Sequence, residues 1–284
     1  DTAIPLILLL LIVDRGGVER CVGLARNQRR RHGEGAGVVG QPGRVRPQTV
    51  LRQRSLQGTL PARPLLVTTV VSTTMLRRVG QAYGARVTET LTGFKWIWDK
   101  ALEAESVGET FLFGFEEALG YCVGSAVRDK DGIGAAQLLM ELAADLASRG
   151  ETLLDRLEAL EQDHGVHLTR QVVAVLDGQD GAERLDRVMG SLRQDPPASV
   201  GDLVVERIQD LDGPDAEAAG LPRSNVWTCW LTGGHRLVVR PSGTEPKLKA
   251  YIEARAEAIH DAALLERLLT RYERKYPEEI DRWR

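Results

Sequence analysis

The sequence has few cysteines, no apolar run of membrane-spanning length and no lysine in its first 64 residues. Its three cysteines, Cys21, Cys122 and Cys229, are far apart and form no CxxC pair. This argues against a disulfide framework or a zinc motif and favours a reducing, cytoplasmic compartment. The apolar run at residues 4–13 is too short to cross a bilayer, and no basic segment precedes it as in a signal peptide. We therefore interpret it as an element of an incomplete domain and expect no membrane association.

Positive charge is concentrated in residues 1–64. This segment holds eleven arginines against four acidic residues, and because the whole chain has a net charge of −3, the remainder carries a surplus of ten negative charges. Residues 15–64 are also rich in Gly and Pro and lack hydrophobic periodicity, which predicts poor order. Arginine without lysine is typical of a shifted reading frame in a GC-rich gene. The alternative, a nucleic-acid-binding arm around residues 29–31, lacks aromatic side chains that could stack on bases.

Apolar patterns from residue 65 onward predict strands that alternate with helices. The predicted strands are residues 65–71, 86–90, 110–113 and 166–176. The predicted helices are residues 72–83, 131–147 and 152–162. This alternation favours an α/β fold class for residues 65–180, with a mostly parallel or mixed sheet in which residues 166–176 form an edge strand.

The pattern changes in the last hundred residues. A helix is predicted at residues 182–192, before the turn at Pro196. The strands that follow are predicted at residues 203–208, 226–231, 236–239 and 248–252. A final amphipathic helix is predicted at residues 256–271. Strands in series followed by a helix favour a smaller α+β domain over residues 181–284, with an antiparallel sheet.

Residues 240–247, R-P-S-G-T-E-P-K, join two of these predicted strands. The guanidinium of Arg240 offers a fork for two phosphate oxygens, and Ser242 and Thr244 add hydroxyls. Gly243 lets backbone N–H groups approach a ligand closely, so the combination suits a phosphate dianion. The residues alone fit a plain hairpin loop, whose Ser and Thr only cap the backbone, equally well.

Two further loops place charged side chains after predicted strands. Lys95 follows a flexible Gly93, where an ammonium could lie near a phosphate or a transferring proton, or could simply be a surface lysine among aromatic residues. Glu116 and Glu117 follow the strand at residues 110–113. Carboxylates there could accept hydrogen bonds from sugar hydroxyls, do acid–base work, bind a cation or begin a helix.

Four motifs occur in a fixed order: T-G-F-K-W-I, G-F-E-E-A-L-G-Y, V-R-D-K-D-G-I and R-P-S-G-T-E-P-K-L-K. By itself the third, around residues 128–132, indicates a turn and a helix cap at Asp131 rather than a calcium loop, because the later acidic residues are missing. Together, the four motifs resemble the last two domains of the α-D-phosphohexomutases, the phosphoglucomutase and phosphomannomutase superfamily. The resemblance covers about residue 65 to the end of the chain.

The resemblance implies four domains around one cleft. The first would supply a phosphoserine, the second a Mg²⁺ site of three Asp, the third a sugar-reading loop and the fourth a phosphate clamp. The activity implied is transfer of phosphate between C1 and C6 of a hexose, with glucose 1,6-bisphosphate as activator and intermediate. The site residues implied are Lys95 as the active-site lysine, Glu116 and Glu117 in the sugar loop, and Arg240, Ser242, Gly243 and Thr244 in the clamp.

Two departures from the family pattern limit this interpretation. Ala118 stands where many relatives have a serine in G-E-x-S-G, so the preferred sugar is left open. No T-A-S-H-N-P-like serine loop and no D-x-D-x-D-R metal loop occurs, and residues 14–20 match the latter poorly. We therefore expect the C-terminal half of a phosphohexomutase, which binds a sugar phosphate without turnover. The alternative is a stand-alone sugar-phosphate-binding module that has no catalytic role.

Overall fold

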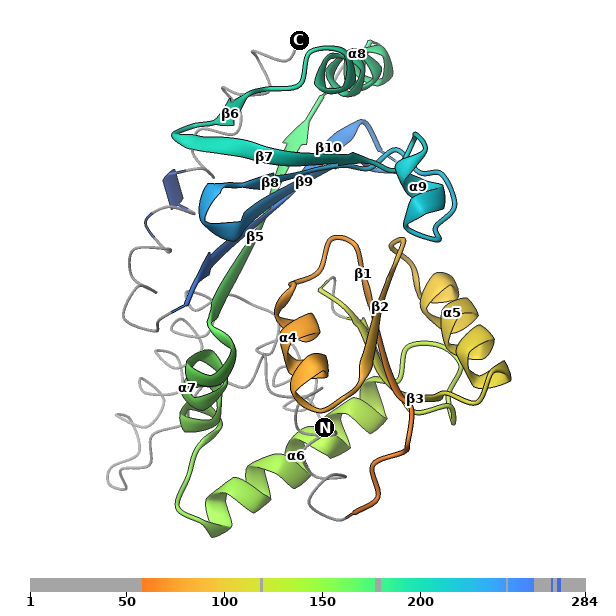
Figure 1. Cartoon of the computed structure of the whole chain (residues 1–284), viewed down its shortest axis with the longest axis vertical. Coiled ribbons are helices and arrows are strands. Elements are labelled where there is room, and N and C mark those ends of the chain that lie inside the picture. The colour runs from red at the N-terminus through yellow and green to blue at the C-terminus, as the bar shows by residue number, and fades with distance from the viewer. Residues whose placement is uncertain are drawn as a thin grey trace, which may run out of the picture. The chain divides into compact units, whose positions relative to one another are not determined.

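The computed structural model describes residues 58–117, 120–176, 180–243 and 245–257, together with residues 267, 270 and 271 (Figure 1). The predictions made for residues 1–57 lie outside these residues, as does most of the helix predicted at residues 256–271. The chain divides into two compact units, residues 1–165 and residues 166–284.

The first unit is built on a four-stranded mixed sheet. Its strands are β1 (Pro64–Thr69), β2 (Arg86–Thr90), β3 (Thr110–Glu116) and β4 (Gly120–Val123). They lie in the order β2-β1-β3-β4, with β1 parallel to both β2 and β3, and β4 antiparallel to β3. The mixed sheet expected from the sequence is confirmed, and β4 is an addition that the sequence patterns did not predict.

Helices cover both faces of this sheet. The helices of the first unit are α4 (Met75–Ala82), α5 (Phe94–Ser106), α6 (Gly132–Ser148) and α7 (Leu153–His164). Apolar side chains of α4, α6 and α7 pack around Leu66 and Phe113 in one buried cluster. Those of α5 pack around Leu65 and Val67 in another. Because successive side chains of a strand point to opposite faces, α5 lies on the face of the sheet opposite α4 (Figure 1).

Two helix starts follow directly from their capping residues. The side chain of Asp131 accepts a hydrogen bond from the Gly134 N–H at the start of α6, as its predicted cap role requires. Thr152 and Asp155 form a reciprocal capping box at the start of α7. Ser72, by contrast, does not cap α4: its hydroxyl contacts that of Thr69, and the helix begins three residues later than the prediction.

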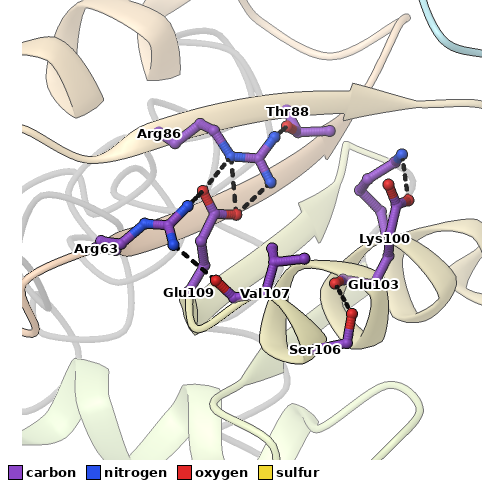
Figure 2. A network of polar contacts seen from close by, with 8 residues as sticks. All are labelled: Arg63, Arg86, Thr88, Lys100, Glu103, Ser106, Val107 and Glu109. Carbon is purple, nitrogen blue, oxygen red and sulfur yellow. Dashed lines mark hydrogen bonds and ion pairs between the residues drawn. The ribbon is translucent and has the colours of Figure 1, made fainter.

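The amino ends of the three parallel strands meet at an ion cluster (Figure 2). Glu109, just before β3, lies between Arg86, the first residue of β2, and Arg63, just before β1. Arg86 Nη2 lies 2.5 Å from Glu109 Oε2, and Arg63 Nη2 lies 3.4 Å from Oε1. The Glu109 side chain is only 9% exposed. Its carboxylate therefore ties the starts of three strands together.

The second unit is a six-stranded sheet with the order β5-β10-β9-β8-β7-β6, in which every pair is antiparallel. Its strands are β5 (Val166–Val175), β6 (Ser199–Val200), β7 (Leu203–Asp210), β8 (Trp227–Leu231), β9 (His235–Pro241) and β10 (Lys247–Ala256). Its helical segments are α8 (Gly181–Gln194), the short α9 (Asp215–Ala218) and the 3-10 turn η1 (Thr232–Gly234). The apolar side of α8 packs with one face of the sheet around the buried Trp227. The predicted antiparallel α+β architecture is confirmed.

Two expectations need correction. The predicted edge strand at residues 166–176 is an edge strand, but it pairs with β10 in the second unit rather than with the first sheet. The predicted final helix cannot begin at residue 256, because Ala256 still pairs with Val166 at the end of β10.

Helix α5, which follows the T-G-F-K motif, was not predicted. Its buried residues are Phe94, Ile97, Trp98, Ala101 and Ala104, which are spaced as on one face of a helix.

Candidate functional site

The carboxyl ends of β1, β2 and β3 form one edge of the first sheet. From β1 the chain passes through α4 to β2 on one side, and from β2 it returns through α5 to β3 on the other side of β1. The two helices lie on opposite faces, so their loops part at this edge. Open α/β sheets bind ligands at such a reversal of strand order.

Two consecutive carboxylates join the loops at this edge. Glu116, the last residue of β3, accepts a short hydrogen bond from the backbone N–H of Gly93, which precedes α5. Glu117 accepts one from the backbone N–H of Thr73, at an N–O distance of 2.6 Å. Glu116 therefore holds the loop that follows β2, and Glu117 holds the loop that follows β1. They do not begin a helix, because the chain returns as β4 from Gly120.

Gly120 allows the turn between β3 and β4 to lie close to α5. A Cβ atom at this position would collide with the ring of Phe94, the first residue of that helix. The absence of a side chain at Gly120 thus brings the end of the β3–β4 turn against the amino end of the helix that carries Lys95. The remaining turn residues, Ala118 and Leu119, lie outside the described part of the chain.

Two lysines lie near the amino end of α5. Lys95 is exposed in the first turn, with its Nζ 4.9 Å from the centroid of the neighbouring Trp96 ring. Lys130 lies with its Nζ 4.5 Å from the centroid of the Phe94 ring. The sequence predicted only that Lys130 lies in a turn. Nothing in the local sequence pattern shows that residues 128–132 lie beside α5. The structure therefore adds a second ammonium to this edge.

The second unit presents the R-P-S-G-T-E-P-K segment as the hairpin between β9 and β10, as the strand pattern predicted. The Ser242 N–H donates to the Lys247 carbonyl and the Lys247 N–H to the Glu245 carbonyl, each at 2.7 Å. These bonds close the loop and use two of its backbone donors. Arg240, Ser242 and Gly243 are described here, whereas Thr244 lies outside the described residues.

The hairpin has a surplus of positive charge. Arg240 lies directly opposite Lys249 in the β9–β10 register, and like charges in such a pair repel. Lys247 Nζ lies 2.8 Å from the Glu245 carboxylate. This hydrogen bond, followed by the charges of Lys247 and Lys249, lowers the pKa of Glu245 below its ordinary value. Two lysines therefore act on one carboxylate, and Arg240 lies opposite one of these lysines, a setting that favours a bound anion.

Other chemistry is limited in the part of the chain that the structure describes. Burial raises the pKa of both the Cys122 and the Cys229 thiols to about 12, so neither is a ready nucleophile. No group of three or more His, Cys, Asp or Glu side chains among the described residues could hold a metal ion. None of the described helices is long and apolar enough to span a bilayer.

Comparisons with known proteins identify both units. Residues 49–163 match the family of phosphoglucomutase/phosphomannomutase α/β/α domain III, and residues 228–270 match the corresponding C-terminal domain. The chain belongs to the α-D-phosphohexomutase superfamily. The first matched part contains the G-F-E-E-A-L-G-Y motif and the second contains the R-P-S-G-T-E-P-K motif.

Several phosphohexomutases with different named substrates are similar to this chain. A probable phosphomannomutase of Haemophilus influenzae is 36% identical over 199 residues, which are 69% of this chain and 37% of the relative. A phosphopentomutase of Pongo abelii is 35% identical, with 66% and 32% covered. A phosphoglucomutase of Staphylococcus haemolyticus is 32% identical, with 68% and 36% covered. The chain thus spans about a third of the length of these curated phosphohexomutases.

Solved structures show the same fold. Parafusin, a phosphoglucomutase from Paramecium solved in an open form, superposes with a TM-score of 0.60 at 16% identity, covering 86% of this chain and 43% of its own. A putative phosphomannomutase from Thermus thermophilus gives 0.51 at 21% identity, covering 83% of this chain and 40% of its own. At these identities the likeness is one of fold.

Proposed function

We propose that this chain binds a phosphorylated sugar and corresponds to the C-terminal half of a phosphohexomutase. The observation that carries this proposal is the β9–β10 hairpin, which places Arg240 beside Lys249 in a chain of this family. A phosphate dianion there would relieve the repulsion between the two cations, and a guanidinium can hold two of its oxygens in parallel.

The other hairpin residues have matching roles. The hydroxyls of Ser242 and Thr244 would donate to phosphate oxygens, and the Gly243 N–H would do the same. Among the described residues other than its two chain neighbours, no atom would lie within 4 Å of a Cβ at Gly243, and its φ is not left-handed. The folded chain itself therefore does not require glycine at this position, which favours close approach of a ligand as the reason for it.

The first unit would read the sugar. Glu116 ends β3 at the edge where α/β sheets bind ligands, and its carboxylate can accept hydrogen bonds from vicinal hydroxyls. Glu117 lies beside it in the same loop. Lys95, in the first turn of α5, would place its ammonium near the phosphoryl group or near a transferring proton, as expected from the family. Lys130 could supply a further positive charge.

The complete enzyme would interconvert sugar 1-phosphates and 6-phosphates through a phosphoserine and a bisphosphorylated intermediate, with glucose 1,6-bisphosphate as activator. Mg²⁺ would neutralise charge on the phosphoryl group in that reaction. The described residues do not offer a fitting metal site. We expect this chain to bind sugar phosphate without turnover, and to do so in the cytoplasm.

Calorimetric titration of the whole chain tests this function. Glucose 6-phosphate and inorganic phosphate should both bind, and glucose should bind far more weakly, because the hairpin recognises the phosphate. A chain that binds glucose as well as glucose 6-phosphate, or neither of them, contradicts the proposal.

A further inference from the structure

Glu117 makes a contact that sugar reading does not require. Its Oε1 accepts a hydrogen bond from the Thr73 N–H at 2.6 Å, between residues 44 positions apart in sequence. Thr73 belongs to the segment of residues 70–74, which connects β1 to α4. The contact thus links the sugar loop to a segment to which neither the family motifs nor the proposed function gives a role.

The link begins where the sheet ladder ends. The ladder between β1 and β3 ends at the pair Val67 and Gly114. One residue further, the buried Thr68 hydroxyl donates to the Phe115 carbonyl at 3.1 Å. The Glu117 bond to Thr73 lies beyond that. Side chains therefore keep the two chain segments together past the point at which backbone pairing stops.

The anchored segment is rich in hydroxyl groups. Thr69, Ser72, Thr73 and Thr74 all lie at or next to residues 70–74. Local bonds shape the turn: Ser72 Oγ lies 2.9 Å from Thr69 Oγ1, and the Met75 N–H donates to Thr73 Oγ1 at 3.3 Å. The segment also ends at the amino terminus of α4, which carries a partial positive charge. Hydroxyl groups and a helix amino end are both suited to a polar, anionic ligand.

We propose that Glu117 is a positioning residue, which holds residues 70–74 against the sugar loop so that this segment forms a wall of the sugar-phosphate site. The proposal rests on the proposed function and refines the part that Glu117 plays in it. Glu116 reads the sugar, and Glu117 acts through Thr73. A carboxylate suits this role because its hydrogen bond to an N–H is stronger than that of a neutral acceptor.

Amide hydrogen exchange in the ligand-free chain tests the contact itself. Glu117→Ala should speed exchange at the Thr73 amide by about tenfold or more, because a charge-assisted bond is lost. Glu117→Gln keeps an acceptor and should restore most of the protection. Glu116→Ala should speed hydrogen exchange at the Gly93 amide and leave exchange at the Thr73 amide unchanged. Glu158→Ala, an exposed site on α7, is the control that should change neither.

Binding measured on the same variants tests the link to the site. Glu117→Ala should weaken the binding of glucose 6-phosphate and of mannose 6-phosphate by the same factor, about three- to tenfold. Glu117→Gln should recover most of this affinity. Circular dichroism and urea unfolding establish whether each variant is folded. If Glu117→Ala does not fold, Glu117→Gln carries the test. Its hydrogen-exchange protection at the Thr73 amide and its affinity for sugar phosphate are both expected near those of the wild type.

The outcomes separate this proposal from the proposed function. Unchanged Thr73 exchange in Glu117→Ala overturns the positioning role even if sugar phosphates bind to the wild type. Losses that differ between the two sugars, with normal Thr73 protection, mean direct sugar contact and also overturn it. If the wild type binds no sugar phosphate, the proposed function fails. The assignment of residues 70–74 to the wall of the site then fails too, whatever the exchange data show. Faster Thr73 exchange together with equal losses supports the proposal.

Discussion

Glu116 accepts a hydrogen bond from the backbone N–H of Gly93, two residues before Lys95. The bond joins the end of β3 to the amino end of α5, although β1 lies between β2 and β3 in the sheet. The loop after β2 therefore bends over the end of β1 to reach the carboxylate. This contact brings the T-G-F-K motif and the G-F-E-E motif, separated by about twenty residues in the sequence, to one edge of the sheet.

Glu116→Gln should weaken sugar-phosphate binding less than loss of the clamp arginine. The amide oxygen can still accept from Gly93 or from a hydroxyl, but without the negative charge the bonds are weaker. The loss should vary with the sugar, since the side chain reads hydroxyls, and should be absent for inorganic phosphate. Titration calorimetry with glucose 6-phosphate, mannose 6-phosphate and phosphate measures this. An equal loss for all three ligands would contradict the sugar-reading role.

Glu109→Ala should destabilise the first unit without affecting binding. Its carboxylate joins Arg63 and Arg86 at the strand edge away from the site (Figure 2). Because both arginines are about half exposed, we expect a loss of only about 1 kcal/mol in the free energy of unfolding. Glu103→Ala is the matched control, since Glu103 pairs with Lys100 on the surface and is 66% exposed. Urea unfolding should separate the two variants, and equal stability would contradict the account.

His235 should make the second unit less stable in mild acid. Burial, followed by the nearby charge of Arg255, lowers the pKa of His235 below its ordinary value near 6.5. Its Nδ1 accepts a hydrogen bond from the Arg255 N–H at 3.0 Å, which requires that nitrogen to be unprotonated. The His235 side chain therefore binds a proton more readily in the unfolded chain than in the folded one. Its contribution to the free energy of unfolding is fully present above the ordinary pKa and is lost as the pH drops below that value.

Urea unfolding at about pH 7.5 and about pH 5.5 measures this dependence. His235→Asn, whose Oδ1 can replace Nδ1 as the acceptor, should show a smaller loss on acidification than the wild type. Other groups titrate in the same range, among them His164, whose pKa is also lowered by burial. The difference between variant and wild type is therefore the quantity that matters. The same pH dependence in both would contradict the role given to His235.

The chain should show no mutase turnover on glucose 1-phosphate or mannose 1-phosphate, even with Mg²⁺ and glucose 1,6-bisphosphate. Phosphoryl transfer needs a positioned acceptor and a charge-neutralising metal, and the sequence contains neither family loop. A coupled assay against a buffer blank checks this. Turnover that survives replacement of Ser55, the one serine in residues 1–64, would contradict the mechanistic assignment.

Sequence patterns predicted the parts of the fold that depend on local chemistry. Asp131 caps α6 because a short carboxylate favours that position whatever surrounds it, and the β9–β10 hairpin follows from alternating residues around a Pro- and Gly-containing loop. The sheet to which β5 belongs could not be predicted in this way. Its pairing with β10 joins residues about eighty positions apart, and an alternating strand pattern does not specify a partner.

The candidate site shows the same division. The motifs single out Glu116, Glu117 and Arg240 as candidates, because unusual residue types stand in a recognisable order. They did not reveal the bond from Thr73 to Glu117 or the position of Lys130 over Phe94. Both contacts depend on how loops far apart in the sequence meet, and a lone threonine or lysine carries no local sign of its partner.

Arg240 is the residue on which the proposed function depends most. Titration calorimetry of the wild type, Arg240→Ala and Arg240→Lys with glucose 6-phosphate and inorganic phosphate is the most direct test. We predict that Arg240→Ala loses tenfold or more in affinity for both ligands, since charge-assisted hydrogen bonds are each worth about 1.5–3 kcal/mol. Arg240→Lys should recover little, because an ammonium lacks the guanidinium fork. Affinities for Arg240→Ala equal to those of the wild type would mean that the loop is only a hairpin.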